Sequence, residues 1–273
     1  MTFEDYRKID AVNASSLKEM RKSPRHFAYR IKHPMEDTPR LGLGRATHTA
    51  VFEPDRFPLD YALWDGDRRG KAYAAFCEQH PHQTILKAEE YATCLAMRDA
   101  VRSHPVAGVL LAPPGEAEKV VTWTDEATGL ACKARLDWWR VGLLCDLKTT
   151  ADVDEHKFAG LAFRMGYHVQ MAFYRTGLAA TGLDAPPPRI IAVETSAPHD
   201  VAVFALDDDA LWKGETEVAD LLAKVAAGKF SNLWPGRYPE ERPLSIPAWA
   251  FDSTDSGDFD SLGLEALATT EAA

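Results

Sequence analysis

Two neighbouring segments, residues 130–139 and 143–149, constrain the fold of this chain more than any other feature. Both alternate in polarity and are rich in Leu, Trp and Cys, which predicts two β-strands. Val141 and Gly142 stand between them and predict a two-residue turn. We therefore expect a β-hairpin in which residue 140 pairs with residue 143.

Polar side chains gather on one face of this predicted hairpin. The register places Asp137 opposite Asp146. The two-residue period of a strand then places Lys148 beside Asp146 and Arg135 opposite Lys148. The other face is predicted to be apolar and to contain Leu136, Trp138, Cys145 and Leu147.

The resulting patch of two carboxylates and an ammonium group favours a metal site. Carboxylate oxygens are hard ligands suited to Mg²⁺ or Mn²⁺. Two aspartates in direct cross-strand contact repel each other unless a cation lies between them. The apolar flanks also predict a central hairpin with partly desolvated carboxylates. The simpler alternative is a solvated salt bridge, because triplets of this kind are common.

Further motifs follow in a fixed order along the chain. They are residues 41–54 with His48, residues 117–137 with Glu118 and Asp137, residues 146–150 with Lys148, and residues 166–174 with Gln170 and Tyr174. Together with the hairpin, these pieces resemble the PD-(D/E)xK nuclease superfamily. Within it, they are similar to the RecE-like (exonuclease VIII) branch of the RecB-type nucleases, and the opening segment, residues 13–29, is also similar to this branch.

The resemblance implies an α/β fold with a PD-(D/E)xK restriction-endonuclease-like core, a mixed central sheet flanked by helices, and a helical N-terminal part. The alternation of predicted strands and helices agrees with a layered core. We expect one nuclease domain over residues 1–250, mainly helical over 1–115 and with the sheet core plus helices over 116–250. Residues 55–70 are expected to be a loop and residues 155–181 one long helix. The segment 251–273 predicts a disordered acidic tail.

The resemblance also implies roles for the motif residues. It implies Mg²⁺, which Mn²⁺ can replace, bound by His48, Asp137, Asp146 and the backbone carbonyl of Leu147. Lys148 would orient a water molecule or stabilise negative charge on the phosphate. A lone helical histidine is usually satisfied by a local group, but the Gly-x-Gly-Arg-Ala-Thr sequence before His48 favours the ligand role.

Three motif residues have two interpretations each. Glu118 could hold a metal-bound water molecule, or it could pair with Lys133 or Lys148. Gln170 and Tyr174 lie one helical turn apart and could be core residues joined by a buried hydrogen bond. The resemblance implies instead that they contact the catalytic lysine or the DNA backbone.

The formal charge of −10 is unfavourable for a nucleic-acid-binding protein, but the charge is unevenly distributed. Residues 1–50 carry 10 Lys or Arg and 6 Asp or Glu, a net charge of +4, whereas residues 201–273 carry 5 and 14, a net charge of −9. The basic stretch from Lys18 onward predicts either a solvated helix face or a helix that binds phosphates near the metal site. The candidate DNA contacts are Lys22, Arg25, Arg45 and Arg135.

The function that the resemblance implies is a Mg²⁺-dependent exodeoxyribonuclease acting on duplex DNA ends. RecE-like proteins digest from 5′ to 3′, form ring-shaped homo-oligomers and work with a single-strand annealing (RecT-like) protein in phage-type recombination. Two rivals remain open. One is a related single-strand exonuclease or endonuclease, which these motifs do not separate. The other is a non-catalytic DNA-end-binding protein, against which the intact acidic residues and lysine count.

Composition limits the location and the chemistry of the chain. No apolar stretch approaches the length of a membrane span, and the N-terminus lacks a signal-peptide pattern, so we expect a cytoplasmic protein. The four cysteines show no Cys-x-x-Cys spacing, which argues against a zinc site or a disulfide framework. Cys132 and Cys145 are predicted to be buried free thiols on the apolar side of the hairpin.

Overall fold

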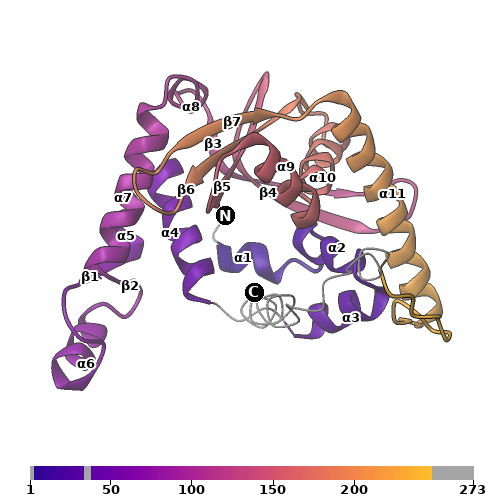
Figure 1. Cartoon of the computed structure of the whole chain (residues 1–273), viewed down its shortest axis with the longest axis horizontal. Coiled ribbons are helices and arrows are strands. Elements are labelled where there is room, and N and C mark those ends of the chain that lie inside the picture. The colour runs from indigo at the N-terminus through magenta and orange to yellow at the C-terminus, as the bar shows by residue number, and fades with distance from the viewer. Residues whose placement is uncertain (1–2, 34–37, 248–273) are drawn as a thin grey trace, which may run out of the picture. The chain divides into compact units, whose positions relative to one another are not determined.

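A five-stranded mixed sheet forms the centre of the computed structural model, which describes residues 3–33 and 38–247 (Figure 1). Within this sheet, β5 and β6 pair in parallel and the other neighbours pair antiparallel. The mixed sheet with flanking helices confirms the expected fold class. The strands, in spatial order, are β3 (Glu116–Thr124), β4 (Ala131–Arg140), β5 (Leu143–Thr150), β6 (Pro188–Glu194) and β7 (Val201–Ala205).

The predicted hairpin register is confirmed at its closed end. Arg140 pairs with Leu143, and the ladder runs on to Trp138 and Cys145. It ends there, so Asp137 does not continue the regular pairing. Instead, an oxygen of the Asp137 carboxylate accepts a hydrogen bond of 2.8 Å from the backbone N–H of Leu147.

The strand distortion beside Asp137 coincides with an unusual backbone conformation on the neighbouring strand. Glu118 on β3 lies between two residues that pair with Leu136 and Trp138, and it has a φ of +54°, in the left-handed region that side chains rarely adopt. The interrupted ladder reverses the expected alternation. Leu136 therefore packs on the opposite side of the sheet from Trp138, Cys145 and Leu147, which corrects the prediction that all four share a face. Cys132 and Cys145 are buried free thiols as expected, but they too lie on opposite sides.

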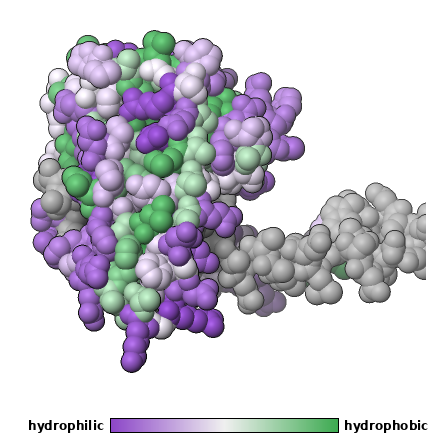
Figure 2. All heavy atoms as spheres, turned by 90° about the vertical axis from the view of Figure 1, so that its left-hand side faces the viewer, coloured by the Kyte–Doolittle hydropathy of each residue, from purple (hydrophilic) through white to green (hydrophobic). Residues whose placement is uncertain are grey.

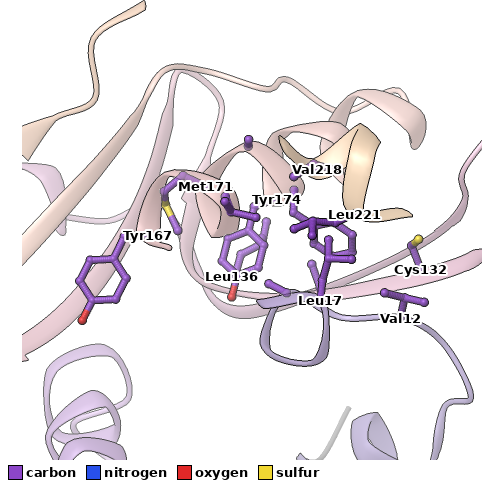
Figure 3. Close-up of a cluster of buried hydrophobic side chains, with 14 of the residues drawn as sticks. Val12, Leu17, Cys132, Leu136, Tyr167, Met171, Tyr174, Val218 and Leu221 are labelled. Carbon is purple, nitrogen blue, oxygen red and sulfur yellow. The ribbon is translucent and has the colours of Figure 1, made fainter. Parts of the chain in front are cut away.

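Two hydrophobic layers cover the sheet. One packs against helices on the right of Figure 1 and includes Leu17, Leu136 and Met171. Figure 3 shows Leu17 pointing into this cluster beneath Leu221, with Tyr167 at its edge. The other layer packs against helices on the left and includes Val51 and Met97. On that side, hydrophilic and hydrophobic residues are interleaved over the surface (Figure 2).

The N-terminal part is helical, as predicted. Helix α2 begins with a capping box, in which Asn13 and Ser16 bond each other's backbone N–H groups at 2.8 and 3.2 Å. Ser23 caps α3, which has proline in its first turn. The helices of this part are α1 (Phe3–Lys8), α2 (Ala14–Met20), α3 (Pro24–Lys32) and α4 (Pro39–Phe52).

The segment expected to be a loop over residues 55–70 contains regular structure. It holds α5 (Phe57–Asp60) and β1 (Tyr61–Trp64). Strand β1 pairs in parallel with β2 (Thr84–Lys87), and this distant partner, which the local sequence does not reveal, stabilises the strand. The remaining helices of this part are α6 (Gly70–Gln79), α7 (Ala88–Ser103) and α8 (Ala107–Leu110).

The single helix expected over residues 155–181 is two helices. Gly166 separates α9 (Glu155–Met165) from α10 (Tyr167–Ala180) with a left-handed φ of +65°. Glycine is the usual residue in this helix-ending conformation because it has no Cβ. A Cβ on Gly166 would also lie 2.9 Å from the guanidinium of Arg21. Helix α11 (Asp208–Ser231) follows β7.

The chain divides into two units after Arg237. Residues 3–33 and 38–237 of the first unit contain all the helices and strands given above. Residues 238–247 of the second unit have no helix or strand, and the tail predicted over residues 251–273 lies outside the described residues. Among the described helices, none is both long and apolar enough to cross a membrane.

Candidate active site

Three potential metal ligands converge at the distorted part of the sheet. His48 comes from α4, Glu118 from β3 and Asp137 from β4, and their ligand atoms all lie within 4.8 Å of one another. The Nδ1 atom of His48 lies 3.3 Å from an oxygen of Asp137. The structure therefore brings together three of the residues that the sequence motifs single out.

Glu118 reaches this group through its unusual backbone conformation. Its carboxylate forms an ion pair with Arg135 and not with either predicted lysine. Lys133 instead donates hydrogen bonds to the carbonyls of Tyr6 and Ile9 at 2.8 and 2.7 Å. Burial, followed by the nearby charge of Asp137, raises the pKa of Glu118 to about 7, against the opposing effect of Arg135.

Asp137 is held in its charged form. Burial alone would raise the pKa of its carboxyl, but His48, Lys148 and the Leu147 N–H outweigh burial, so its pKa is lowered. For His48, burial opposes the charged form, but the neighbouring Asp137 outweighs it and raises the pKa of the imidazole. The carboxylate of Asp137 therefore stabilises the protonated imidazole of His48, and the protonated imidazole stabilises the carboxylate.

Asp146 lies deeper in the sheet than Asp137 and is fully buried. One of its oxygens forms an ion pair with Lys148, and the other accepts a hydrogen bond of 2.7 Å from Gln170. Burial and the charge of Asp137 raise the pKa of Asp146, whereas Lys148 lowers it. Burial would lower the pKa of Lys148, but the charges of Asp146 and Asp137 outweigh burial and raise it, so this lysine is a stable ammonium group.

The Gln170–Tyr174 motif supports the aspartate, not the lysine. Gln170 also donates a hydrogen bond of 3.0 Å to the hydroxyl of Tyr174, and both side chains are buried. The buried hydrogen bond that we considered from the sequence is present. The contact to Lys148 implied by the resemblance is replaced by a contact to Asp146.

Lys18 belongs to this network, although no motif assigns it a role. Its ammonium group on α2 lies 3.3 Å from the side-chain oxygen of Gln170. The only sequence signal for Lys18 is its place at the start of the basic stretch. That signal does not distinguish it from the cations around it, because its partner is 152 residues away.

The predicted DNA contacts are spread over the first unit. Lys22 pairs with Glu19 at 3.1 Å, and Arg25 donates its backbone N–H to the carbonyl of Pro235. Arg45 lies one turn before His48 on α4, and Arg135 pairs with Glu118 at the edge of that group.

A family model matches most of the chain. Residues 13–241 match the family model described as "PDDEXK-like domain of unknown function (DUF3799)". The search of curated proteins gives no match.

Two solved structures match the chain over most of its length. One is a protein from Eubacterium rectale provisionally named an exonuclease, with a TM-score of 0.63 and 13% identity, covering 94% of this chain and 98% of that chain. The other is a phage-related exonuclease from Haemophilus somnus 129PT, with a TM-score of 0.37 and 14% identity over 84% of this chain and 99% of that chain. At these identities, the first supports the fold alone, and the second is too distant to support an inference.

Proposed function

The chain belongs to the PDDEXK-like family DUF3799, and on this basis we propose that it is a divalent-metal-dependent DNA nuclease that hydrolyses phosphodiester bonds from duplex ends. One observation carries the proposal. Three potential metal ligands, His48, Glu118 and Asp137, meet beside the ion pair of Asp146 and Lys148. A nuclease of this fold needs such a combination of metal ligands with a nearby ammonium.

The donor set fits a hard divalent cation. Carboxylate oxygens suit Mg²⁺ and Mn²⁺, and an imidazole nitrogen is compatible with Mn²⁺ as well. The charge of Asp137 raises the pKa of Glu118, and a cation bound between them would offset this repulsion. We propose that His48 and Asp137 hold the ion together with Glu118, which acts directly or through a bound water molecule. The resemblance adds Asp146 and the Leu147 carbonyl as further ligands. When bound, such an ion polarises a phosphate and lowers the pKa of water.

The protein's own groups have distinct roles in this proposal. Lys148 is kept charged and aimed by Asp146, so its ammonium can stabilise negative charge that develops on the phosphate. Gln170 fixes the carboxylate of Asp146 in turn. Asp137 is oriented by the Leu147 N–H, which leaves its second oxygen for a ligand.

The finer parts of the proposal rest on the resemblance to RecE-like nucleases. They are the 5′ to 3′ direction, the preference for duplex ends, the cooperation with a single-strand annealing protein and the ring-shaped homo-oligomer. A phage-type recombination role and a cytoplasmic location belong to the same set.

A direct test compares linear and closed circular duplex DNA, both labelled, in Mg²⁺, in Mn²⁺ and in EDTA. We expect short products to appear early from the linear form in metal alone, and the circle to be spared. Nicking or linearising of the circle would show an endonuclease, and digestion of single strands alone would show a single-strand exonuclease. Binding of ends without any cleavage would show a non-catalytic end-binding protein.

The site itself is tested by Asp137→Ala and Asp146→Ala. Each should abolish cleavage while the protein stays folded, because each removes a ligand of the proposed ion. Thermal melts with and without Mg²⁺ should show stabilisation of the wild type that both variants lose. Cleavage near the wild-type rate in both variants would exclude this site.

A further inference from the structure

Two lysines from distant parts of the chain gather on one aromatic ring. The ammonium of Lys148, on β5, lies 4.8 Å from the centre of the Tyr167 ring, and that of Lys18, on α2, lies 5.7 Å from it. Figure 3 shows Tyr167 at the rim of the hydrophobic cluster, with its hydroxyl turned away from Leu136. Both lysines are partly exposed, so neither is enclosed in the core.

The two lysines differ in their partners. Lys148 is neutralised by the carboxylate of Asp146. Lys18 has an amide oxygen of Gln170 at 3.3 Å and the ring of Tyr167, and among residues 3–33 and 38–247 no carboxylate lies within ion-pair distance of it. The acidic residue next to it, Glu19, pairs with Lys22 at 3.1 Å.

A half-buried cation without a counter-ion is costly to maintain. Burial, and then the like charge of Lys148, lowers the pKa of Lys18 to about 8, and the charges of Asp146 and Glu19 only partly oppose this. Desolvated charges are normally paired, so a cation left in this condition beside a reaction site favours an incoming anion. Lysine is a compact donor that binds phosphate oxygens as a point charge.

We propose that Lys18 is a phosphate-binding residue that holds the nucleic-acid strand at the phosphate next to the one being cleaved. This inference rests on the proposed nuclease function and adds a substrate contact that lies outside the sequence motifs. Lys148 serves the reacting phosphate, and Lys18 serves its neighbour in the same strand. Gln170 joins the two lysines, because it bonds both Lys18 and the aspartate that pairs with Lys148.

A phosphate contact and a purely structural role for Lys18 lead to different expected effects of its substitution. If Lys18 only held Gln170, its loss would disturb Asp146 and lower turnover, but would leave the number of ionic contacts with DNA unchanged. A phosphate contact instead contributes to the dependence of affinity on salt, by about one unit in the slope of log affinity against log salt. The salt slope therefore separates the two roles.

The experiment measures binding of a fluorescent duplex end to the full chain in EDTA, where no cleavage occurs, over a range of salt concentrations. We expect Lys18→Gln to weaken binding about tenfold at low salt, as the loss of one charge-assisted contact does, and to reduce the slope by about one. Lys18→Arg should restore the slope. The control is Lys224→Gln on α11, which removes an equally charged residue that is half exposed and paired with Asp220 at 2.6 Å, and should keep the wild-type slope.

Wild-type affinity and slope in Lys18→Gln would overturn the proposal, as would a loss of turnover with no change in slope. If the wild type binds DNA but never cleaves it, the nuclease proposal fails, and the slope still decides the role of Lys18. If the wild type does not bind DNA, both fail. Thermal melting checks the fold of each variant, and Lys18→Met, which keeps the aliphatic stem, replaces Lys18→Gln if the latter is unfolded.

Discussion

Gln170 on α10 donates a hydrogen bond of 2.7 Å to the carboxylate of Asp146 on β5. The amide nitrogen also donates to Tyr174, and the amide oxygen accepts from Lys18. A helix therefore fixes the buried aspartate of the sheet, and one amide side chain connects it to a second lysine. Mutations on α10 should therefore affect the properties of Asp146 and of its ion pair with Lys148 on β5.

We expect Gln170→Leu to destabilise the protein by about 1–3 kcal/mol, because it leaves an oxygen of buried Asp146 without its donor. It should also raise the pKa of Asp146 further and so weaken metal binding near neutral pH. Denaturant unfolding and metal titration measure the two effects. Tyr174→Phe is the matched control, because it removes one hydroxyl and keeps the bond to Asp146. Equal losses in both variants would contradict this account of Gln170.

Lys148→Ala should retain metal binding and lose turnover. Lys148 lowers the pKa of Asp137 and Asp146 but also repels the cation, and these two effects of its removal on metal binding oppose each other. One missing stabilising donor typically costs about 10²–10³ in rate. Single-turnover cleavage at saturating Mg²⁺ and calorimetric metal titration measure the two quantities. The control Lys119→Ala removes a lysine of β3 that pairs with Glu116. Loss of metal binding with turnover kept at saturating metal would show that the assigned role is wrong.

His168 makes a contribution to the free energy of unfolding that decreases as the pH falls. It is buried on α10, with Nε2 3.2 Å from Glu217, and burial lowers its pKa although Glu217 opposes this. The unfolded chain then takes up the proton first, near its ordinary value of about 6.5. Stability from neutral His168 is therefore complete above that pH and is lost as the pH falls through the lowered folded value.

The measurement is the free energy of unfolding between pH 7.5 and about 5, the range that brackets the ordinary histidine value. Glu118 and His48, whose pKa values are raised, contribute the opposite trend over this range, so the comparison is with the wild-type curve and not with zero. As the pH falls, His168→Gln should lose less free energy of unfolding than the wild type, or gain more. His82→Gln, which changes an exposed histidine, should follow the wild-type curve. An unchanged slope in His168→Gln would show that the charge of His168 does not differ between the folded and unfolded states.

Local alternation was enough to predict the hairpin and its register at Arg140 and Leu143. It was not enough to predict the reversal at Glu118, because a left-handed φ at a glutamate depends on tertiary contacts and leaves no pattern in the chain. Gly166 did carry a signal, since glycine favours helix ends, but an isolated glycine is also tolerated within a helix. Sequence spacing alone does not distinguish a glycine that ends a helix from a glycine within one.

The contact of α11 with α10 depends on the absence of a side chain at Gly214. A Cβ there would lie 2.5 Å from the backbone oxygen of His168 and 2.9 Å from Ala172. Backbone cannot move away cheaply, so we expect Gly214→Ala to cost about 1–3 kcal/mol of overpacking, more than alanine returns in helix propensity. Chemical denaturation measures this loss, and a drop in turnover should accompany it if α10 shifts and carries Gln170 with it.

Gly160 on α9 provides the matched control, because a Cβ there would meet no atom within 4 Å. The same substitution, Gly160→Ala, should therefore stabilise the protein by up to about 1 kcal/mol, since only the helix propensity changes. Opposite signs at these two glycines would show that the close approach of α11 to α10 sets the cost. If Gly214→Ala were as stable as Gly160→Ala, the two helices would have to be able to separate without loss of packing, and the position of Gln170 would not depend on α11.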